Sequence, residues 1–409
     1  MSYETPEAVA RMKQKNSRIF STEDARRLAK RRLPRLVFDF IEGAAGREVG
    51  AARNVSQFDN IMLQPRVMAD VAQCASATEL MGQSYKVPFG IAPMGMCNLV
   101  HPKADTALAN AAKAMDFPVC LSSAASTSIE DMARMAGSSA WFQLYFGASQ
   151  DASLAMVERA RVAGFDTLVL TVDVPQVSRR VRDLRNGFTV PFAMTPRAFM
   201  DFATHPKWSL RTLAAGAPRP MNFTDSNGVN TFDRGASRSG ADWAFLEVLR
   251  GKWPGRLVVK GVTSAADALK IRSLGADAIY VSNHGGRQLD SVPPAIRLLP
   301  LIRAAVGPDF PLLFDSGIRG GEDIVKALAL GADFVMIGRP ALYALGAEGA
   351  VGLNSLLKCF EADISVVMAQ LGVTSISQLG PDEVFDDAAL KGEDLETTPR
   401  AALQLAAKT

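Results

Sequence analysis

The sequence predicts an α/β protein, a TIM (β/α)8 barrel with a helical N-terminal extension and a long insertion after the fourth strand. Eight short apolar runs alternate with segments of helical spacing, such as 102–115 and 265–274. The runs lack polar alternation, which is typical of strands buried on both faces of a parallel sheet. These runs are residues 87–95, 118–123, 141–146, 167–173, 256–261, 278–285, 311–317 and 334–340.

Polar and reactive side chains gather where these runs end. In a barrel the carboxyl ends of the strands form one open mouth, where active sites lie. A doubly wound sheet is the alternative, but no GxGxxG turn follows the first run, as that fold usually shows. The residues at the run ends are Ser122, Gln143, Tyr145, Thr171, Asp173, Lys260, His284, Asp315 and Arg339.

The chain outside the eight units divides into three segments. Residues 1–85 are expected to form a helical N-terminal extension, which contains LPRLVFDFIEG at 33–43. The barrel occupies 86–380 and is interrupted at about 186–237 by an insertion rich in Pro, Phe, Met and Arg, which is typical of a lid or binding loop. Residues 381–409 are expected to form a C-terminal tail.

Composition narrows the function classes. A formal net charge of +3 does not favour nucleic-acid binding, and the basic run at 26–35 is interpreted as a solvated helix face or subunit contact. The four cysteines lack metal-site spacing and fit a reducing compartment. The first residues contain no signal-peptide core, and no apolar run reaches the ~18–20 residues of a spanning helix. A cytoplasmic protein is expected.

The most informative motif is VSNHGGRQLD at 281–290. His284, one of only three histidines, follows a strand directly and carries the side chain best suited to move a proton near neutral pH. Two glycines allow close approach of the backbone to a ligand. Arg287 offers a planar charged fork that suits a carboxylate. The motif therefore indicates a site for a small hydroxy or keto acid.

With these residues in place, the sequence resembles the FMN-dependent 2-hydroxy acid dehydrogenase/oxidase family, which includes glycolate oxidase, L-lactate dehydrogenase and mandelate dehydrogenase. The resemblance covers roughly residues 24–380, and SNHGGRQLD is its most specific element. It implies FMN at the barrel mouth, oxidation of an (S)-2-hydroxy acid to its 2-keto acid, and a homotetramer.

The resemblance also implies roles on the substrate side. His284 is the catalytic base, and Asp173 holds its ring and stabilises the imidazolium, a pairing that chemistry favours independently. Arg180 and Arg287 bind the substrate carboxylate, with Arg179 more readily structural. Tyr145 hydrogen-bonds the substrate. The structural alternative for His284 is a hydrogen-bonded residue without a catalytic role.

On the cofactor side, the resemblance places Lys260 beside the flavin ring, where a cation favours the reduced anion. The alternative for Lys260 is a lysine that lines the barrel and pairs with an acid. Gly317 and Gly338 could serve only as turn glycines, and Ser122 and Thr171 could be strand-end hydroxyls that satisfy the backbone. The backbone of Pro93, Met94 and Gly95 lies against the ring. The remaining implied cofactor residues are Ser122, Gln143 and Thr171 near the ring, Ser282, and Asp315, Gly317, Arg319, Gly338 and Arg339 at the phosphate.

Two positions depart from the family pattern. Phe40 stands where many relatives carry a tyrosine that reaches the substrate carboxylate. Ala124 stands where glycolate oxidase has a bulky tryptophan. Both changes predict a substrate that is bulkier or more apolar than glycolate.

The insertion and the electron acceptor leave alternatives open. Residues 191–223 mix apolar and basic side chains, and their THPKW resembles a loop of membrane-associated bacterial lactate dehydrogenases. Peripheral binding to the cytoplasmic membrane face is one hypothesis, and a loop folded over its own barrel is the other. Quinone or a similar carrier is favoured over dioxygen, whose use would make an oxidase producing H2O2. A non-redox FMN isomerase and a silent binding barrel are more remote alternatives.

Overall fold

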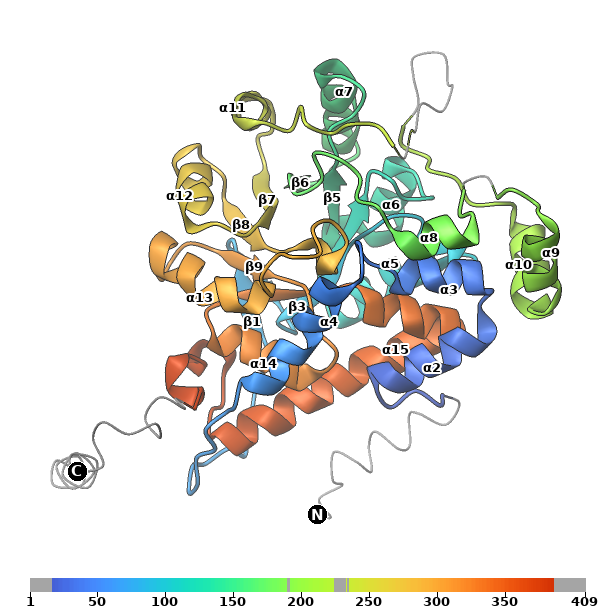
Figure 1. The fold of residues 1–409 in the computed structure, drawn as a ribbon. Helices are drawn as coiled ribbons and strands as arrows, with labels where there is room; N and C mark the ends of the chain where they lie inside the picture. The colour runs from blue at the N-terminus through green and yellow to red at the C-terminus, as the bar shows by residue number, and fades with distance from the viewer. Residues whose placement is uncertain (1–16, 190–191, 224–232, 234, 386–409) are drawn as a thin grey trace, which may run out of the picture.

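The computed structural model describes residues 17–189, 192–223, 233 and 235–385. Its centre is a closed barrel of parallel strands in the order β10-β3-β4-β5-β6-β7-β8-β9 (Figure 1). Each strand overlaps one of the eight apolar runs, so the predicted (β/α)8 barrel is confirmed. The strands are β3 (Phe89–Met94), β4 (Val119–Ser122), β5 (Ala140–Leu144), β6 (Thr167–Thr171), β7 (Arg256–Val262), β8 (Ala278–Val281), β9 (Leu312–Phe314) and β10 (Phe334–Ile337).

The register of the barrel brings the strand ends level with one another. Ser122 pairs with Gln143, and Thr171 pairs with Lys260. Inside the barrel, large side chains such as Trp141, Tyr280 and Phe334 form a buried core. The barrel interior is therefore packed, and side chains from distant parts of the sequence meet at its rim.

Helices surround the barrel, and several begin at residues with capping side chains. Ser128, Ser149, Asp242 and Ser264 each accept a hydrogen bond from a backbone N–H of the first turn, which satisfies donors that a helix start leaves unpaired. The surrounding helices are α5 (Ala104–Met115), α6 (Ile129–Ala136), α7 (Gln150–Val162), α11 (Trp243–Lys252), α12 (Ala265–Ser273), α13 (Ala295–Val306), α14 (Gly321–Ala329) and α15 (Arg339–Leu371).

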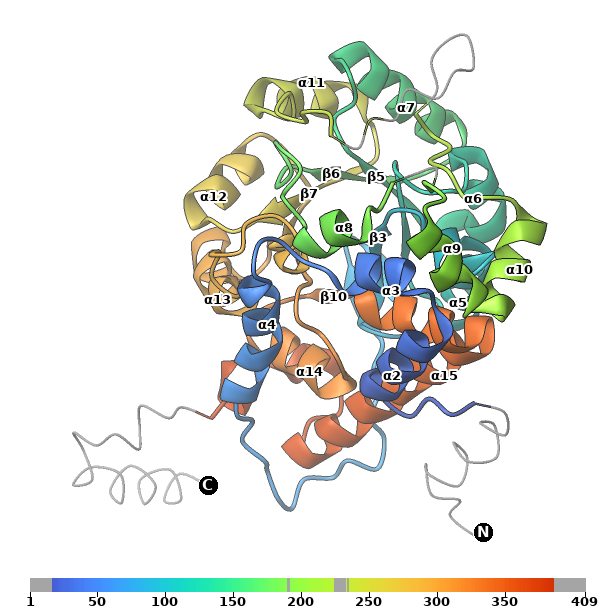
Figure 2. The same cartoon turned by 45° about the vertical axis from the view of Figure 1, so that its right-hand side comes forward.

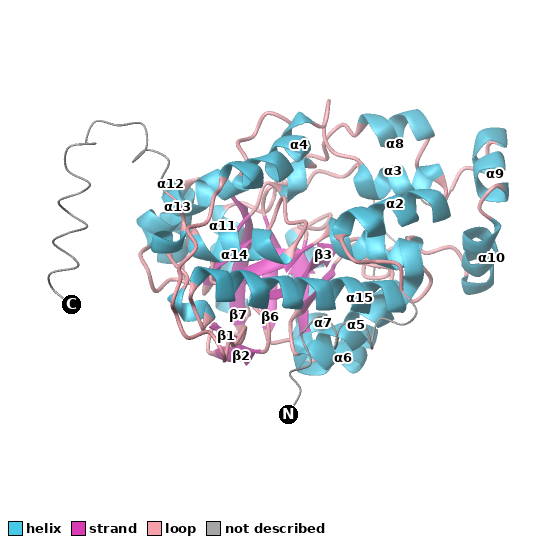
Figure 3. Cartoon of the chain, turned by 90° about the horizontal axis from the view of Figure 1, so that it is seen from below, coloured by secondary structure: helices cyan, strands magenta, loops and turns pink. Residues whose placement is uncertain are grey.

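The N-terminal extension is helical only in part. The helices α2 (Thr22–Arg32), α3 (Arg35–Glu42) and α4 (Val49–Ser56) are followed by an antiparallel pair, β1 (Thr78–Leu80) and β2 (Gln83–Tyr85). Leu80 and Tyr85 join the core inside the barrel, so the hairpin closes its amino-terminal end. Figure 3 shows α3 and α4 at one end of the barrel and β1 and β2 at the other. The carboxyl end of the barrel, toward α3 and α4, is therefore where a site is expected.

The insertion after β6 contains helices rather than a plain loop. These are α8 (Val181–Asn186), α9 (Pro196–Ala203) and α10 (Pro206–Ala215), and α9 and α10 lie beside the barrel next to α3 (Figure 2). Asp201 of α9 accepts hydrogen bonds from the first N–H groups of α3, those of Arg35 at 3.0 Å and Leu36 at 3.1 Å. The Trp208 indole of α10 donates to the Leu99 carbonyl at 3.1 Å. The insertion thus supports the extension. Of the predicted tail, residues 386–409 lie outside the described residues.

Candidate active site

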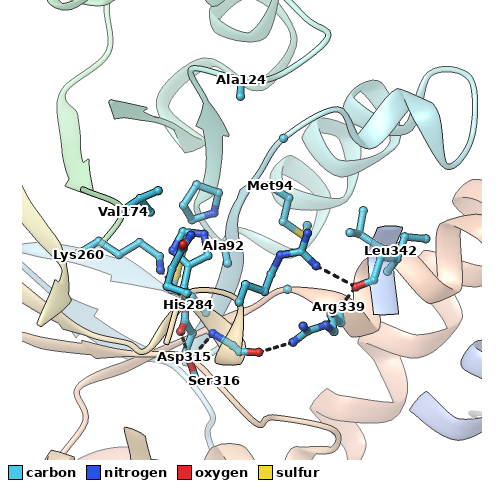
Figure 4. A pocket seen from close by; sticks show the side chains of 18 of the residues that line it. Ala92, Met94, Ala124, Val174, Lys260, His284, Asp315, Ser316, Arg339 and Leu342 are labelled. Carbon is cyan, nitrogen blue, oxygen red and sulfur yellow. Dashed lines mark hydrogen bonds and ion pairs between the residues drawn. The ribbon is translucent and has the colours of Figure 1, made fainter. Parts of the chain in front are cut away.

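The carboxyl ends of the strands open into one cavity. The end of β3, the loops after β8 and β9 and the start of α15 line it, and Phe40 of α3 forms part of its wall. Figure 4 shows Lys260, His284 and Asp315 close together at the strand ends. The residues predicted for the site that line the cavity are Phe40, Pro93, Met94, Gly95, Ala124, Tyr145, Arg180, Lys260, His284, Arg287, Asp315, Gly317, Arg319, Gly338 and Arg339.

His284 lies between two of the residues predicted to accompany it. Its Nδ1 is 2.9 Å from Asp173 Oδ1, and its Nε2 is 3.3 Å from the Tyr145 hydroxyl. A carboxylate accepts only, so the ring proton belongs on Nδ1 and the lone pair on Nε2. The geometry therefore supplies a proton acceptor at Nε2, facing the cavity beside a phenol.

Burial keeps the imidazole neutral. Desolvation lowers the pKa of His284 below its ordinary value of 6.5, although Asp173 acts in the opposite direction. The Asp173 carboxylate already contacts Nδ1, and this hydrogen bond becomes an ion pair once the ring is protonated. Burial, together with Asp173, raises the pKa of Tyr145, so the phenol stays protonated and can donate a hydrogen bond.

Gly261 makes room for the Asp173 carboxylate, and sequence reasoning missed it. A Cβ at this position would lie 2.5 Å from the carboxyl carbon of Asp173, and the backbone has a φ of +102°. A residue with a Cβ is strained at such a φ, whereas glycine is not. Its signal in the sequence was the glycine directly after the strand lysine, Lys260.

Lys260 and Asp315 form a buried ion pair. Lys260 Nζ is 3.2 Å from Asp315 Oδ2 and donates to Ser282 Oγ at 2.9 Å, while Ser282 donates to Asp315 Oδ1 at 2.6 Å. Burial alone would lower the pKa of Lys260, but the Asp315 and Asp173 carboxylates outweigh it and raise that pKa. For Asp315, burial acts to raise the pKa, yet Lys260 and the serine hydroxyls hold it below its usual value. A permanent cation therefore lies at the mouth.

Ser122, Gln143 and Thr171 form a buried chain across three adjacent strand ends. Ser122 Oγ donates to Gln143 Oε1 at 2.8 Å, and Gln143 Nε2 donates to Thr171 Oγ1 at 2.9 Å. These residues do not line the cavity, although the Ala124 N–H, which belongs to the wall, donates to Ser122 Oγ at 3.2 Å. Their role toward a cofactor ring remains a prediction.

The predicted carboxylate-binding arginines reach the cavity from two sides. Arg180 and Arg287 both line it, whereas Arg179 is exposed. Arg287 Nη1 donates to the carbonyls of Phe40 at 3.1 Å and Gly43 at 2.7 Å. These carbonyls end α3, where the helix dipole is negative. Arg287 therefore also fixes the end of α3, and with it the N-terminal extension, to the site.

A second set of cationic groups surrounds the start of α15. Arg339 donates to the Gly285 carbonyl at 2.8 Å and the Gly43 carbonyl at 3.1 Å, and the half-buried Arg319 lines the same cavity. Burial, with the charge of Arg339 contributing, lowers the pKa of Arg319. Two guanidinium groups beside a helix N-terminus make a site for a phosphate. Gly317 lies so close to the Asn54 carbonyl, 2.2 Å from its would-be Cβ, that only glycine fits.

Sequence reasoning missed several residues of the wall. Behind the wall, Phe188 stacks on Phe40, with ring centroids 4.6 Å apart and an interplanar angle of 5°. Val174 and Val177, from the loop after β6, and Arg238, from the end of the insertion, line the cavity. No motif in the sequence surrounds these residues. They reach the cavity only because the fold brings the loop after β6 and the end of the insertion to the mouth of the barrel.

A (β/α)8 barrel with a carboxylate-held histidine and an arginine-rich anion site at its mouth defines an enzyme that binds a phosphorylated cofactor beside its substrate. The chain belongs to the FMN-dependent dehydrogenase family, whose model matches residues 29–386. It is 40% identical over 369 residues to (S)-mandelate dehydrogenase of Pseudomonas putida, with 89% of this chain and 93% of that protein covered.

Two further comparisons agree with this assignment. An L-lactate dehydrogenase of Pseudomonas syringae pv. syringae (strain B728a) is 39% identical over 374 residues, covering 88% of this chain and 97% of that protein. The crystal structure of the monotopic membrane protein (S)-mandelate dehydrogenase superposes with a TM-score of 0.87 at 38% identity, covering 91% of this chain and all of that one. The family resemblance and its FMN cofactor are thereby confirmed.

The residues of the cavity fit FMN. Arg319, Arg339 and the start of α15 would hold its phosphate, and Lys260 would lie beside the ring. A Cβ on Gly95 would come within 3.3 Å of Ala124, so the β3 end presents backbone where a flat ring needs close approach.

Proposed function

We propose that this protein oxidises an (S)-2-hydroxy acid, lactate- or mandelate-like and larger than glycolate, to the 2-keto acid and passes the electrons to quinone or a similar acceptor. The observation that carries this proposal is the placement of His284 between Asp173 and Tyr145, in the cavity that Arg180 and Arg287 also line. Paired guanidinium groups beside a neutral base suit a carboxylate whose α-carbon carries a hydroxyl.

The side chains act together on such a substrate. Arg180 and Arg287 bind the carboxylate, which directs the α-carbon and its hydroxyl toward His284. His284 Nε2 accepts the proton that the substrate releases, and Asp173 stabilises the resulting imidazolium. When bound, FMN would supply the acceptor for the two electrons and the other hydrogen that the substrate loses. Lys260 provides a fixed positive charge that compensates negative charge developing beside it.

The direct test is anaerobic mixing of the yellow holoenzyme with glycolate, (S)-lactate and (S)-mandelate. We expect the absorbance of oxidised flavin to be lost with lactate or mandelate, and kcat/KM to be lowest for glycolate. A colourless protein would support the silent barrel, and yellow protein bleached by none of the acids would contradict the proposed function.

The family match and the arginine pair favour a redox reaction over the non-redox isomerase alternative.

The size of the pocket is expected to depend on Ala124. Ala124→Trp fills space in the cavity wall beside Gly95, so kcat/KM for (S)-mandelate should fall by about 10-fold or more while glycolate is less affected. The measurement is the ratio of the two kcat/KM values in the variant and the unaltered protein. Ala124→Ser is the matched control, because it adds only one atom. A ratio unchanged by tryptophan would show that Ala124 does not set substrate size.

The activity is expected to be lost on the acid side below pH 6.5. His284 must be neutral to accept a proton, and its pKa lies below that ordinary value because it is buried. As pH falls through this pKa the base becomes protonated, so the rate of flavin reduction falls. Asp173→Asn removes a charge that raises the His284 pKa, so the acid limb should move lower still while the rate drops about 10²-fold. An acid limb displaced upward in Asp173→Asn would contradict this assignment.

The insertion supports attachment to a membrane surface. Within the described residues, no helix is long and apolar enough to cross a bilayer. Yet α9 and α10 expose large apolar side chains next to the basic residues Arg197, Lys207 and Arg211, a combination suited to an anionic lipid surface. Attachment to the cytoplasmic face stays a prediction from the sequence. The exposed apolar residues are Phe199, Met200, Leu210 and Leu213.

Charge introduced on this surface should weaken attachment. We expect Phe199→Asp with Leu213→Asp to lower binding to anionic phospholipid vesicles by about tenfold or more, because each apolar side chain contributes through burial. Co-sedimentation measures the effect. Leu301→Asp is the control, because Leu301 is an exposed residue of α13, away from the insertion. Equal sedimentation of the double variant and the unaltered protein would favour an insertion that only supports its own barrel.

The electron acceptor and the oligomeric state complete the proposal. A membrane-facing insertion brings the site near a quinone pool, which favours quinone over dioxygen. Stopped-flow mixing of reduced enzyme with air-saturated buffer distinguishes them, since reoxidation within the turnover time would make the protein an oxidase. The homotetramer stays a prediction from the family resemblance, to be checked by light scattering.

A further inference from the structure

Arg238 is anchored at the mouth by the returning end of the insertion. Its backbone N–H donates to the Pro175 carbonyl at 3.0 Å, in the loop that follows β6. Two residues later, Gly240 lies flat against Phe146, where a Cβ would come within 2.3 Å of the ring. Since Phe146 directly follows Tyr145, both anchors fix this segment to the loops that carry the reactive residues.

The Arg238 side chain is buried against an aromatic ring and a backbone carbonyl. It is 9% exposed, and its guanidinium carbon lies 5.1 Å from the centroid of the Tyr145 ring. Its Nη1 donates to the Ala236 carbonyl at 3.2 Å, and no ion pair to it is found within the described residues. Burial lowers the pKa of Arg238, although Tyr145 and Asp233 act against this. A buried cation with this environment gains most from an anionic partner.

The charged residues of the cavity wall also favour an anionic partner for Arg238. Five arginines and one lysine line it, but only one carboxylate, that of Asp315, which already pairs with Lys260. Arg319 and Arg339 suit the cofactor phosphate, and Arg180 and Arg287 suit the carboxylate on the α-carbon. Arg238 remains, above the ring whose hydroxyl contacts His284.

We propose that Arg238 binds a second carboxylate at the end of the substrate side chain, so that the preferred substrates are 2-hydroxy dicarboxylic acids. This inference rests on the proposed function. The apolar wall formed by Val174 and Val177 accommodates the body of the side chain, and the Arg238 fork binds its charged end.

The test compares substrates of equal shape and different charge. (S)-Malate is paired with (S)-2-hydroxy-4-methylpentanoate, and (S)-2-hydroxyglutarate with (S)-2-hydroxy-5-methylhexanoate. In the unaltered holoenzyme we expect at least one dicarboxylate to exceed its neutral partner in kcat/KM by about tenfold or more. Arg238→Met should lower that ratio by about tenfold or more, chiefly through KM, whereas Arg238→Lys keeps part of it.

Controls separate this inference from its alternatives. Arg297→Met, on exposed α13, should leave the ratio unchanged. Flavin absorbance and thermal unfolding establish that each variant is folded and loaded. A preference for both neutral partners in the unaltered enzyme, or a ratio unchanged in a folded Arg238→Met, would overturn the Arg238 subsite and leave the proposed function intact. Failure of every 2-hydroxy acid to reduce the flavin would instead overturn the proposed function.

Discussion

Replacing His284 with asparagine is expected to lower the rate of flavin reduction by ~10²–10⁴-fold, the contribution of a well-placed general base. In the structure its Nδ1 contacts Asp173 and its Nε2 faces Tyr145 in the cavity, so Nε2 is the position from which a proton is accepted. Asparagine keeps similar volume and polarity but does not accept a proton near neutral pH. Rapid anaerobic mixing with the preferred acid measures the loss.

The controls for His284→Asn test whether the variant still binds flavin and has lost only the proton acceptor. The variant should remain yellow, because Lys260, Arg319 and Arg339 are untouched. Tyr145→Phe, which removes only the neighbouring hydroxyl, should have a smaller effect than loss of the base. If His284→Asn reduced its flavin at the original rate, another group would have to be the base and the assignment of the site would fail.

Replacing Lys260 with methionine is expected to destabilise the protein by about 3–5 kcal/mol and to weaken flavin binding. Asp315 would be left as a buried carboxylate without its ion-pair partner, which is the costly outcome when a buried pair is broken. With Lys260 gone, burial would raise the Asp315 pKa, so the loss of stability should become smaller as pH falls and the carboxyl group is protonated. Urea unfolding at several pH values and flavin absorbance measure both effects.

The double variant Lys260→Met with Asp315→Asn separates the two roles of Lys260. Removing both charges should restore much of the stability, because no uncompensated charge is left buried. It should not restore flavin reduction, since the cation beside the ring is still absent. Full activity in the double variant would mean that Lys260 serves only the ion pair, which was the structural alternative for this residue.

The barrel could be predicted because its strands depend on local patterns. Runs such as 167–173 and 278–285 are buried on both faces, so their apolar character is continuous and visible in the sequence. The polar residue that ends each run was also visible, and parallel topology places those ends at one rim. His284, Asp173 and Lys260 were therefore located correctly at the mouth, although they are far apart along the chain.

Other features depended on contacts between distant segments. The expected helical extension proved to include β1 and β2, whose short strands are stabilised by packing Leu80 and Tyr85 into the barrel. The expected loop of the insertion contains α9 and α10, which hold α3 through Asp201. Each of these elements is determined by a partner that no local pattern identifies.

The amino-acid sequence by itself determined the barrel, the family and the residues that would meet at the mouth, because periodicity and motifs are local properties. Only the tertiary structure decided how those residues are charged and what surrounds them. It placed Arg238 above Tyr145, left Ser122 and Gln143 behind the cavity wall, and set Arg287 against the end of α3. The physical reason is that burial and electrostatic coupling depend on through-space distances, which a linear pattern does not contain.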